Sequence, residues 1–159
     1  QHPLLEDHSL GAEALTDAEL CTFQVARMAE LFGDAELGMD AAWMAAAEKR
    51  LVEEHLTTVA KRQGTARVAY LCLELYDRLR ALGRLAPDGS CEFPLRHHHI
   101  ADALGMTDVH VNRCIQALRK RGLSRIRDRR LYILREAELR DFAAFPAELD
   151  FARPKRPIF

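Results

Sequence analysis

Residues 96–122 constrain the fold more than any other stretch, because small, apolar and helix-ending residues recur there at fixed spacings. The stretch predicts a helix over 97–104, a left-handed glycine at Gly105 that ends it, and a second helix over 108–121. Ala101 has to be small, because two helices that cross at a steep angle bring their backbones close together. The residues that face inward together are Ile100, Ala101, Leu104, Val111, Cys114, Ile115 and Leu118. This spacing is that of a helix-turn-helix.

A candidate hairpin follows the second helix directly. Residues 124–134 alternate apolar and basic side chains around an Asp128-Arg129 turn, which predicts two antiparallel strands. A hairpin in this place is the wing of a winged helix, and its arginines would face phosphates. The alternative for each arginine is a solvated charge that only prevents the exposed strand edge from pairing with another chain. A short closing helix is expected over 136–145, and no regular structure is predicted for the tail over 146–159.

An amphipathic helix is predicted before the helix-turn-helix. Gly64 interrupts the preceding pattern, Thr65 is the expected N-cap, and Gly83 is the expected residue after the last turn. The apolar positions of this helix are Val68, Leu71, Cys72, Leu75, Leu79 and Leu82. A turn at 86–89 and a short strand at 91–95 are expected next.

A longer helical pattern covers residues 34–63, and its apolar side chains recur at spacings of seven, four and three. A long helix with one apolar stripe needs a partner along its length, and in a chain of 159 residues a second copy across a two-fold axis is expected. The alternative is an ordinary core helix that breaks near Gly38. The residues expected at the interface between copies are Leu37, Met44, Leu51, Val52, Leu56 and Val59.

The first part of the chain is less regular. Residues 7–23 predict two short strands, one around Leu10, Ala12 and Ala14 and one around Leu20, Cys21 and Phe23, with a turn at 15–17 between them. Two strands do not make a stable sheet alone. They are expected either to pack on a later segment or to close a larger sheet. A short helical pattern follows over 24–32.

Charge is segregated along the chain although the formal net charge is only -1. Residues 64–135 carry a net charge of +7, whereas residues 1–63 carry -7. The positive middle segment favours an anionic partner, with nucleic acid first, although a solvated basic face would give the same count. The longest apolar run, residues 41–47, is far shorter than the about 18 residues of a membrane span, so no membrane partner is expected. Four scattered cysteines without a CxxC pair favour a reducing cytoplasm.

Three segments together resemble the C-terminal half of a Crp/Fnr family transcription regulator. They read RVAYLCLELYDRL at 67–79, HIADALGMTDVHVNRCIQALRKRGL at 99–123 and RRLYIL at 129–134. Residues 10–23 resemble the last strands of that family's cyclic-nucleotide-binding-like β-roll, and residues 34–63 resemble its dimerisation helix. The expected fold is therefore mainly α with small β elements: the end of a β-roll over 1–33, a dimerisation helix over 34–63, a winged helix-turn-helix over 64–145 and a tail.

The resemblance implies a homodimer that binds a near-palindromic operator on double-stranded DNA and regulates transcription, with RNA polymerase as a further candidate partner. The candidate base contacts are Asp108, Val109, Asn112 and Arg113. The candidate phosphate contacts are Thr107, His110, Lys120, Arg125, Arg127, Arg129 and Arg130. Arg113 matches the family arginine that reads guanine, whereas Val109 replaces the common family glutamate and cannot accept a hydrogen bond from cytosine.

No cofactor is expected within these residues. The family stretch that holds a cyclic nucleotide's phosphate would lie before residue 1, so a cyclic nucleotide or another small effector is expected only with a complete sensor domain upstream. The four cysteines do not reproduce the iron–sulfur set of the family.

Three other functions are weaker interpretations. Three adjacent histidines, His97, His98 and His99, point in different directions on a helix, so no metal site is expected. Cys72 and Cys114 fall on apolar helix faces, where a buried thiol is inert, so no enzyme is expected. A winged helix that binds protein instead of DNA is the main alternative. Such a module would lack an exposed arginine at position 113 and carry more apolar residues on its second helix.

Overall fold

The computed structural model describes residues 13–22, 24–28 and 33–146. The chain divides into two units, with the boundary between Glu48 and Lys49. The division falls inside the long helix α2, Ala35–Lys61, so the last turns of α2 belong to the second unit. The predicted fold class, mainly α with small β elements, is confirmed: the described residues are mostly helical and carry one three-stranded sheet.

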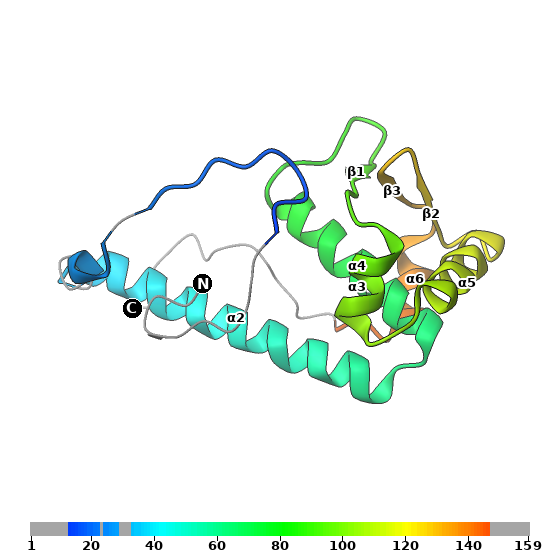
Figure 1. The fold of residues 1–159 in the computed structure, drawn as a ribbon, viewed down its shortest axis with the longest axis horizontal. Helices are drawn as coiled ribbons and strands as arrows, with labels where there is room; N and C mark the ends of the chain where they lie inside the picture. The colour runs from blue at the N-terminus through cyan, green and yellow to red at the C-terminus, as the bar shows by residue number, and fades with distance from the viewer. Residues whose placement is uncertain (1–12, 23, 29–32, 147–159) are drawn as a thin grey trace. The chain divides into compact units, whose positions relative to one another are not determined.

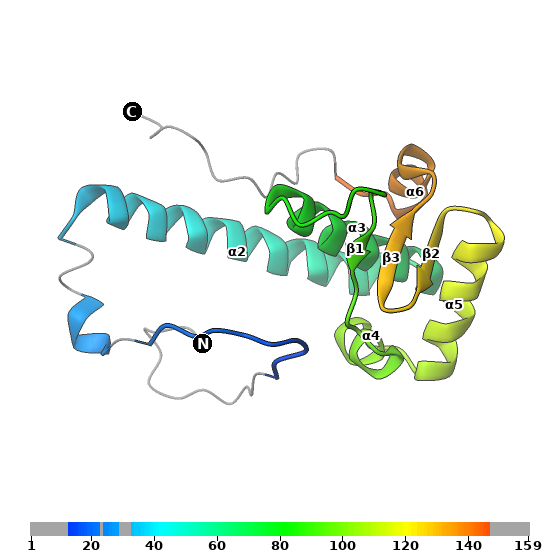
Figure 2. The ribbon, with the colours of Figure 1, turned by 90° about the horizontal axis from the view of Figure 1, so that it is seen from above.

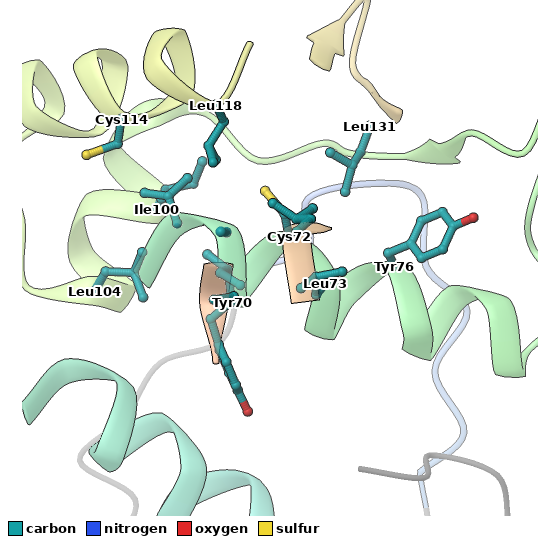
Figure 3. Packing of buried hydrophobic residues seen from close by; sticks show 14 of the residues in the cluster. Tyr70, Cys72, Leu73, Tyr76, Ile100, Leu104, Cys114, Leu118 and Leu131 are labelled. Atoms are coloured by element: carbon teal, nitrogen blue, oxygen red, sulfur yellow. The ribbon is translucent and has the colours of Figure 1, made fainter. Parts of the chain in front are cut away.

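The second unit is built around α3, Gly64–Ala81, which is buried on several sides. Three helices surround it: α4 at His97–Leu104, α5 at Asp108–Lys120 and α6 at Glu136–Ala143 (Figure 1). Each presents one apolar face to α3. Figure 3 shows Cys72 and Leu73 of α3 near the side chains of Ile100, Leu118 and Leu131, while the ring of Tyr70 points away from them. Burial of these apolar faces stabilises the unit, at roughly 25 cal/mol for each Å² of apolar surface removed from water.

A small antiparallel sheet covers one end of this core. Its strands are β1 at Cys91–Glu92, β2 at Ser124–Arg127 and β3 at Arg130–Ile133, in the order β1-β3-β2 (Figure 2). The predicted hairpin is confirmed: β2 and β3 pair through a two-residue turn in which Asp128 and Arg129 both have positive φ, 51° and 56°. Such turns match the twist of the strands that they connect.

The geometry of the predicted helix-turn-helix is also confirmed. Gly105 follows α4 in the left-handed conformation, with φ 61° and ψ 44°, and the Met106 amide donates to the Ala101 carbonyl at 2.9 Å. Ala101 is buried, as the close approach of the two helices requires. Thr107 is the N-cap of α5, where its hydroxyl accepts from the His110 amide at 3.3 Å. The turn therefore fixes where α5 begins.

The long helix α2 is continuous, so the alternative of a break near Gly38 is wrong. Asp34 caps its start by accepting from the Glu36 and Leu37 amides at 2.9 and 3.1 Å. The Gly38 amide donates to the Asp34 carbonyl at 2.8 Å, so the helical bonding passes through the glycine. Twenty-seven residues correspond to about 40 Å of helix. Thr58 is the one α2 residue that is fully buried within the chain.

Several predictions of local structure are wrong. Residues 13–22 are irregular and mostly exposed, so neither predicted strand forms in this part; Leu10, Ala12 and Phe23 lie outside the described residues. A strand needs a neighbour to satisfy its backbone hydrogen bonds, and these residues pair with none of the described strands. Of the helix expected over 24–32, the described part forms a 3-10 turn, η1, at Val25–Arg27.

Two expectations for α3 are also corrected. The break between α2 and α3 lies directly before Gly64, which is the first residue of α3, but the N-cap is Gln63, without a side-chain bond, and not Thr65; the Thr65 hydroxyl instead donates to Cys114 Sγ at 3.5 Å. Leu82 leaves the apolar stripe and is exposed, because the helix ends at Ala81 before completing the next turn. Gly83, with φ 67°, follows the helix end as predicted.

Candidate nucleic-acid interface

The helix α5 has one buried face and one open face. Val111, Cys114 and Leu118 are buried against α3 and α4, and Ile115 is half-buried beside them, as predicted. The open face carries Asp108, Val109, Asn112, Arg113 and Gln116. Val109, in the first turn of the helix, is 63% exposed. The four residues predicted to contact bases therefore share one surface at the N-terminal half of α5.

The predicted phosphate contacts at the two ends of α5 have different surroundings. Thr107 and Lys120 are exposed. His110 is exposed too, but its imidazole lies against Gly64 at the start of α3: a Cβ atom built at Gly64 would be 2.6 Å from His110 Nε2. His110 thus fills the space above a glycine and positions α5 against α3. This contact was missed, and the glycine that begins an apolar helix is the only sign of it in the sequence.

The wing arginines have three different surroundings. Arg127 and Arg129 lie at the exposed tip of the hairpin, where Arg127 pairs with Asp128 at 3.1 Å. Arg130 points back to the core instead: its Nε donates to Ser90 Oγ at 2.8 Å and its Nη2 to the Ser90 carbonyl at 3.2 Å. Arg130 therefore helps to hold β1 next to β3, a pairing that a two-residue strand does not reveal in a sequence.

Arg125 is half-buried and stacks over the ring of Tyr132, the residue opposite it on β3, with its guanidinium carbon 4.5 Å from the ring centroid. Its Nε is buried and makes no hydrogen bond within the described part of the chain. A buried donor of this kind costs free energy unless a partner satisfies it. The stacking orients the guanidinium at the base of the wing.

An ion network around the buried Asp77 fixes α6 to α3 at the end of the unit. Arg140 Nη2 donates to both carboxylate oxygens of Asp77, at 2.7 and 2.8 Å, and to Glu136 Oε1 at 2.7 Å. Arg80 donates to Asp77 at 2.6 Å and to Glu136 at 3.0 Å. Partial burial raises the pKa of Glu136, but the two arginines outweigh this effect and hold the pKa below its usual value.

A second set of basic side chains was also missed by sequence reasoning. His55 and Arg62, at the C-terminal end of α2, and Arg67 in the first turn of α3 all donate to main-chain carbonyls at the ends of other helices. Arg62 donates to the carbonyls of Ala143 and Ala144 at 2.8 and 2.7 Å, and its guanidinium lies 4.4 Å from the ring centroid of Tyr70. Basic residues near a helix junction are the sequence signal for such contacts.

The cysteines and histidines do not form a metal site within the described residues. No three His, Cys, Asp or Glu side chains there come together as metal ligands. Burial raises the pKa of the Cys72 thiol to about 12 and that of Cys91 to about 11, so both stay protonated at neutral pH. His99 accepts a hydrogen bond from the Arg96 amide at the start of α4, which is a capping role. In the described part of the chain, no helix is long and apolar enough to cross a membrane.

Comparison with known proteins agrees with this geometry. Residues 66–142 match the family described as the Crp-like helix-turn-helix domain. The match begins in α3 and ends in α6, so it covers the helix-turn-helix, the wing and the ion network. Residues 66–142 are therefore similar to the Crp-like helix-turn-helix domain, and the predicted resemblance to Crp/Fnr regulators is confirmed.

Two curated relatives extend the similarity over most of the chain. A protein of Rhizobium leguminosarum bv. viciae described as a probable transcriptional activator is 32% identical over 133 residues, 83% of this chain and 55% of its own length. The nitrogen fixation regulation protein FixK of Rhizobium meliloti (strain 1021) is 30% identical over 128 residues, 78% of this chain and 53% of its own length. The chain thus spans about half the length of the curated relatives it matches.

Two solved structures share the fold. FixK2 from Bradyrhizobium japonicum superimposes with a TM-score of 0.61 at 25% identity, and the match covers 81% of this chain and 59% of FixK2. A CRP-family transcriptional regulator from Thermus thermophilus gives a TM-score of 0.57 at 26% identity, covering 70% of this chain and 55% of that one. The chain is accordingly similar to regulators of transcription both in sequence and in structure.

Proposed function

We propose that this chain is a sequence-specific, DNA-binding transcription regulator of the Crp/Fnr type. It binds a near-palindromic operator as a homodimer and inserts α5 into the major groove. The observation that carries the proposal is the open face of α5, where Asp108, Val109, Asn112 and Arg113 stand exposed on a helix whose other face is buried in a Crp-like helix-turn-helix domain.

These four residues have complementary base-reading chemistry. Arg113 offers a two-pronged guanidinium to the O6 and N7 acceptors of guanine, and the Asn112 amide pairs with the N6 and N7 groups of adenine. The exposed Val109 methyls fit the C5-methyl group of thymine, and the Asp108 carboxylate accepts from the cytosine amino group. Each good pair supplies roughly 1–3 kcal/mol of discrimination between bases.

Backbone contacts supply affinity without sequence information. Thr107, Lys120, Arg127 and Arg129 are exposed around α5 and at the wing tip, in keeping with this role. His110, Arg125 and Arg130 contact Gly64, Tyr132 and Ser90. On DNA each of these three side chains would keep that contact and also contact a phosphate. Each phosphate that a dimer neutralises makes the slope of log affinity against log salt concentration more negative by about 0.9.

The second copy is proposed to pack on the apolar face of α2. Leu37, Met44, Val52 and Leu56 are exposed there, the last two at 67% and 68%, while Leu51 and Val59 are half-buried. A symmetric dimer places two recognition helices about 34 Å apart, one turn of the DNA helix. Cytoplasmic location, contact with RNA polymerase and, only with a complete sensor domain upstream, control by a small effector belong to the same proposal.

The proposal is tested by selecting bound duplexes from a random DNA pool at two salt concentrations. A two-fold symmetric motif with guanine at a fixed place in each half, enriched less at high salt, is expected. Arg113→Ala should lose the preference for that guanine. Arg119→Ala, on the same helix with the same loss of charge, should weaken all sequences alike and keep the motif.

Two results would contradict the proposal. Binding without any motif, or a motif that Arg113→Ala leaves unchanged, would mean that α5 does not read bases. No binding at either salt concentration would favour the winged helix that binds protein, with Val109 as its exposed apolar contact.

A further inference from the structure

The last turns of α2 are attached to the end of α4 by two basic side chains. His55 Nε2 donates to the Ala103 carbonyl at 2.7 Å. Arg67, in the first turn of α3, donates from Nη1 to the Leu104 carbonyl at 3.3 Å and from Nε to the Arg62 carbonyl at 2.8 Å. A single guanidinium therefore bridges the point where α2 ends and the point where α4 ends.

These carbonyls are chemically suited to basic partners. The last carbonyls of a helix have no partner in the helix, and the helix dipole places negative potential at that end. Ala103 and Leu104 are the last two residues of α4. Donors from His55 and Arg67 thus satisfy groups that would otherwise depend on water, and the direction of α2 becomes tied to the direction of α4.

The attachment lies directly before the recognition helix. Gly105 follows Leu104 and turns the chain, and Thr107 then caps α5. The Arg67 guanidinium is consequently separated from the start of α5 by one tight turn. A change in the angle between α2 and α4 would carry α5 with it, because α4 and α5 are packed on one another through Ile100, Leu104 and Val111.

We infer that His55 and Arg67 are positioning residues that set the spacing between the two half-sites of the operator. The inference rests on the proposed function, because it needs a dimer that is held by α2 and reads DNA through α5. Neither residue is required to touch DNA. Their loss should therefore relax the preferred spacing and leave the bases that each half reads unchanged.

The experiment uses operators whose two half-sites are moved apart or together by one and two base pairs. Each added base pair moves the second half-site by about 3.4 Å and turns it by about 34°. The wild-type protein should lose at least about tenfold in affinity for one base pair of change, the equivalent of about 1.4 kcal/mol. Arg67→Met, which keeps an apolar stem but no donors, should lose less than about threefold.

Matched variants separate this role from a general loss of charge or stability. Arg84→Met removes the same charge from an exposed position after α3 and should keep the wild-type spacing preference. His55→Gln retains an amide donor for the Ala103 carbonyl and should also keep it, whereas His55→Phe should relax it. If Arg67→Met does not fold, the comparison of His55→Phe with His55→Gln decides the question.

The outcomes distinguish the two proposals. If the wild-type chain shows no base preference on a single half-site, the proposed function itself is wrong. If it reads single half-sites but Arg67→Met and His55→Phe keep the sharp wild-type spacing preference, the positioning role is wrong. A loss of single half-site recognition in these variants would equally contradict it, because their effect would then be on α5 itself.

Discussion

The imidazole of His110 occupies the space in which a side chain at Gly64 would begin: a Cβ atom there would lie 2.6 Å from Nε2 and 2.9 Å from Cε1. Alanine favours helices more than glycine, so replacing an unhindered helical glycine would normally stabilise the protein. Here Gly64→Ala should instead lower the free energy of unfolding by about 1 kcal/mol or more, since His110 has to move. Urea denaturation measures this difference.

The double variant Gly64→Ala with His110→Ser provides the control. Serine is too short to reach the added methyl group, so the pair should be more stable than Gly64→Ala alone by about 1 kcal/mol. Strictly additive effects of the two substitutions would show that the side chain of His110 is not what makes glycine necessary.

The exposed Val109 gives a prediction about base specificity. Val109→Glu supplies a carboxylate that accepts from the cytosine amino group, so the preferred base at one position of each half-site should change to cytosine, by roughly 1–3 kcal/mol. The guanine read by Arg113 should stay the same. Selection from a random pool with the variant measures both positions.

Val109→Gln has nearly the same size as the glutamate variant and no charge, and serves as its control. If both variants select the wild-type motif, Val109 does not approach a base.

The helix-turn-helix could be predicted from the sequence because its constraints are local. Gly105 has to adopt a left-handed conformation, Ala101 has to be small, and the buried face of α5 recurs at helical spacing; each leaves a mark within 27 residues. The hairpin is equally local, because its two strands are joined by a turn of two residues. The open face of α5 follows from the same periodicity.

The pairing of β1 and the contacts of the basic side chains could not be predicted, because they join residues that are distant in the sequence and leave no periodic pattern. The two-residue strand β1 pairs with β3, which lies about 40 residues later in the sequence. Next to this pairing, Arg130 donates to Ser90 and therefore points away from the wing surface. The carbonyl contacts of His55, Arg62 and Arg67 involve acceptors that every residue carries, so the basic side chains near the helix junction do not reveal which carbonyls they contact. The absence of a strand at residues 13–22 shows the opposite case, since an alternating pattern alone does not supply a pairing partner.

The ion network on α6 gives a prediction about stability. Asp77 is buried and accepts from both Arg140 and Arg80, so Asp77→Ala leaves Arg140 with only part of its compensation. The free energy of unfolding should fall by about 3 kcal/mol. Urea denaturation of the purified variant measures it. Asp141→Ala, at an exposed position on α6, should change it by less than about 0.5 kcal/mol, and equal effects of the two substitutions would rule out a special role for the network.

Glu74 gives a prediction about pH. Burial raises the pKa of its carboxyl, and the nearby Arg78 only partly opposes this. A group whose pKa is raised in the folded state contributes stability below its unfolded pKa, about 4.3, and loses that contribution as pH rises through the folded value. Glu74→Gln cannot ionise, so it should be more stable than the wild type at pH 7 and nearly equal to it below pH about 4.

Urea denaturation at several pH values measures this difference. Glu92→Gln, at an exposed strand position, is the control and should show no such growth of stability between acid and neutral pH. A Glu74→Gln variant that is less stable than the wild type at pH 7 would show that the ion pair with Arg78 outweighs the cost of burial.

The exposed apolar face of α2 gives a last prediction, about assembly. Val52→Glu places a charge where the second copy is proposed to pack, and burying an unpaired carboxylate is costly, so the dimer should dissociate at least about tenfold more readily. Sedimentation equilibrium measures the dissociation constant, and the same variant should keep its affinity for a single half-site. Lys61→Gln makes the same change of charge nine residues along, half a turn around the helix, and should leave the dimer intact. A Val52→Glu protein that dimerises as tightly as the wild type would place the interface on a different surface. The proposed role of His55 and Arg67 in half-site spacing would then also be wrong, because it requires a dimer held by α2.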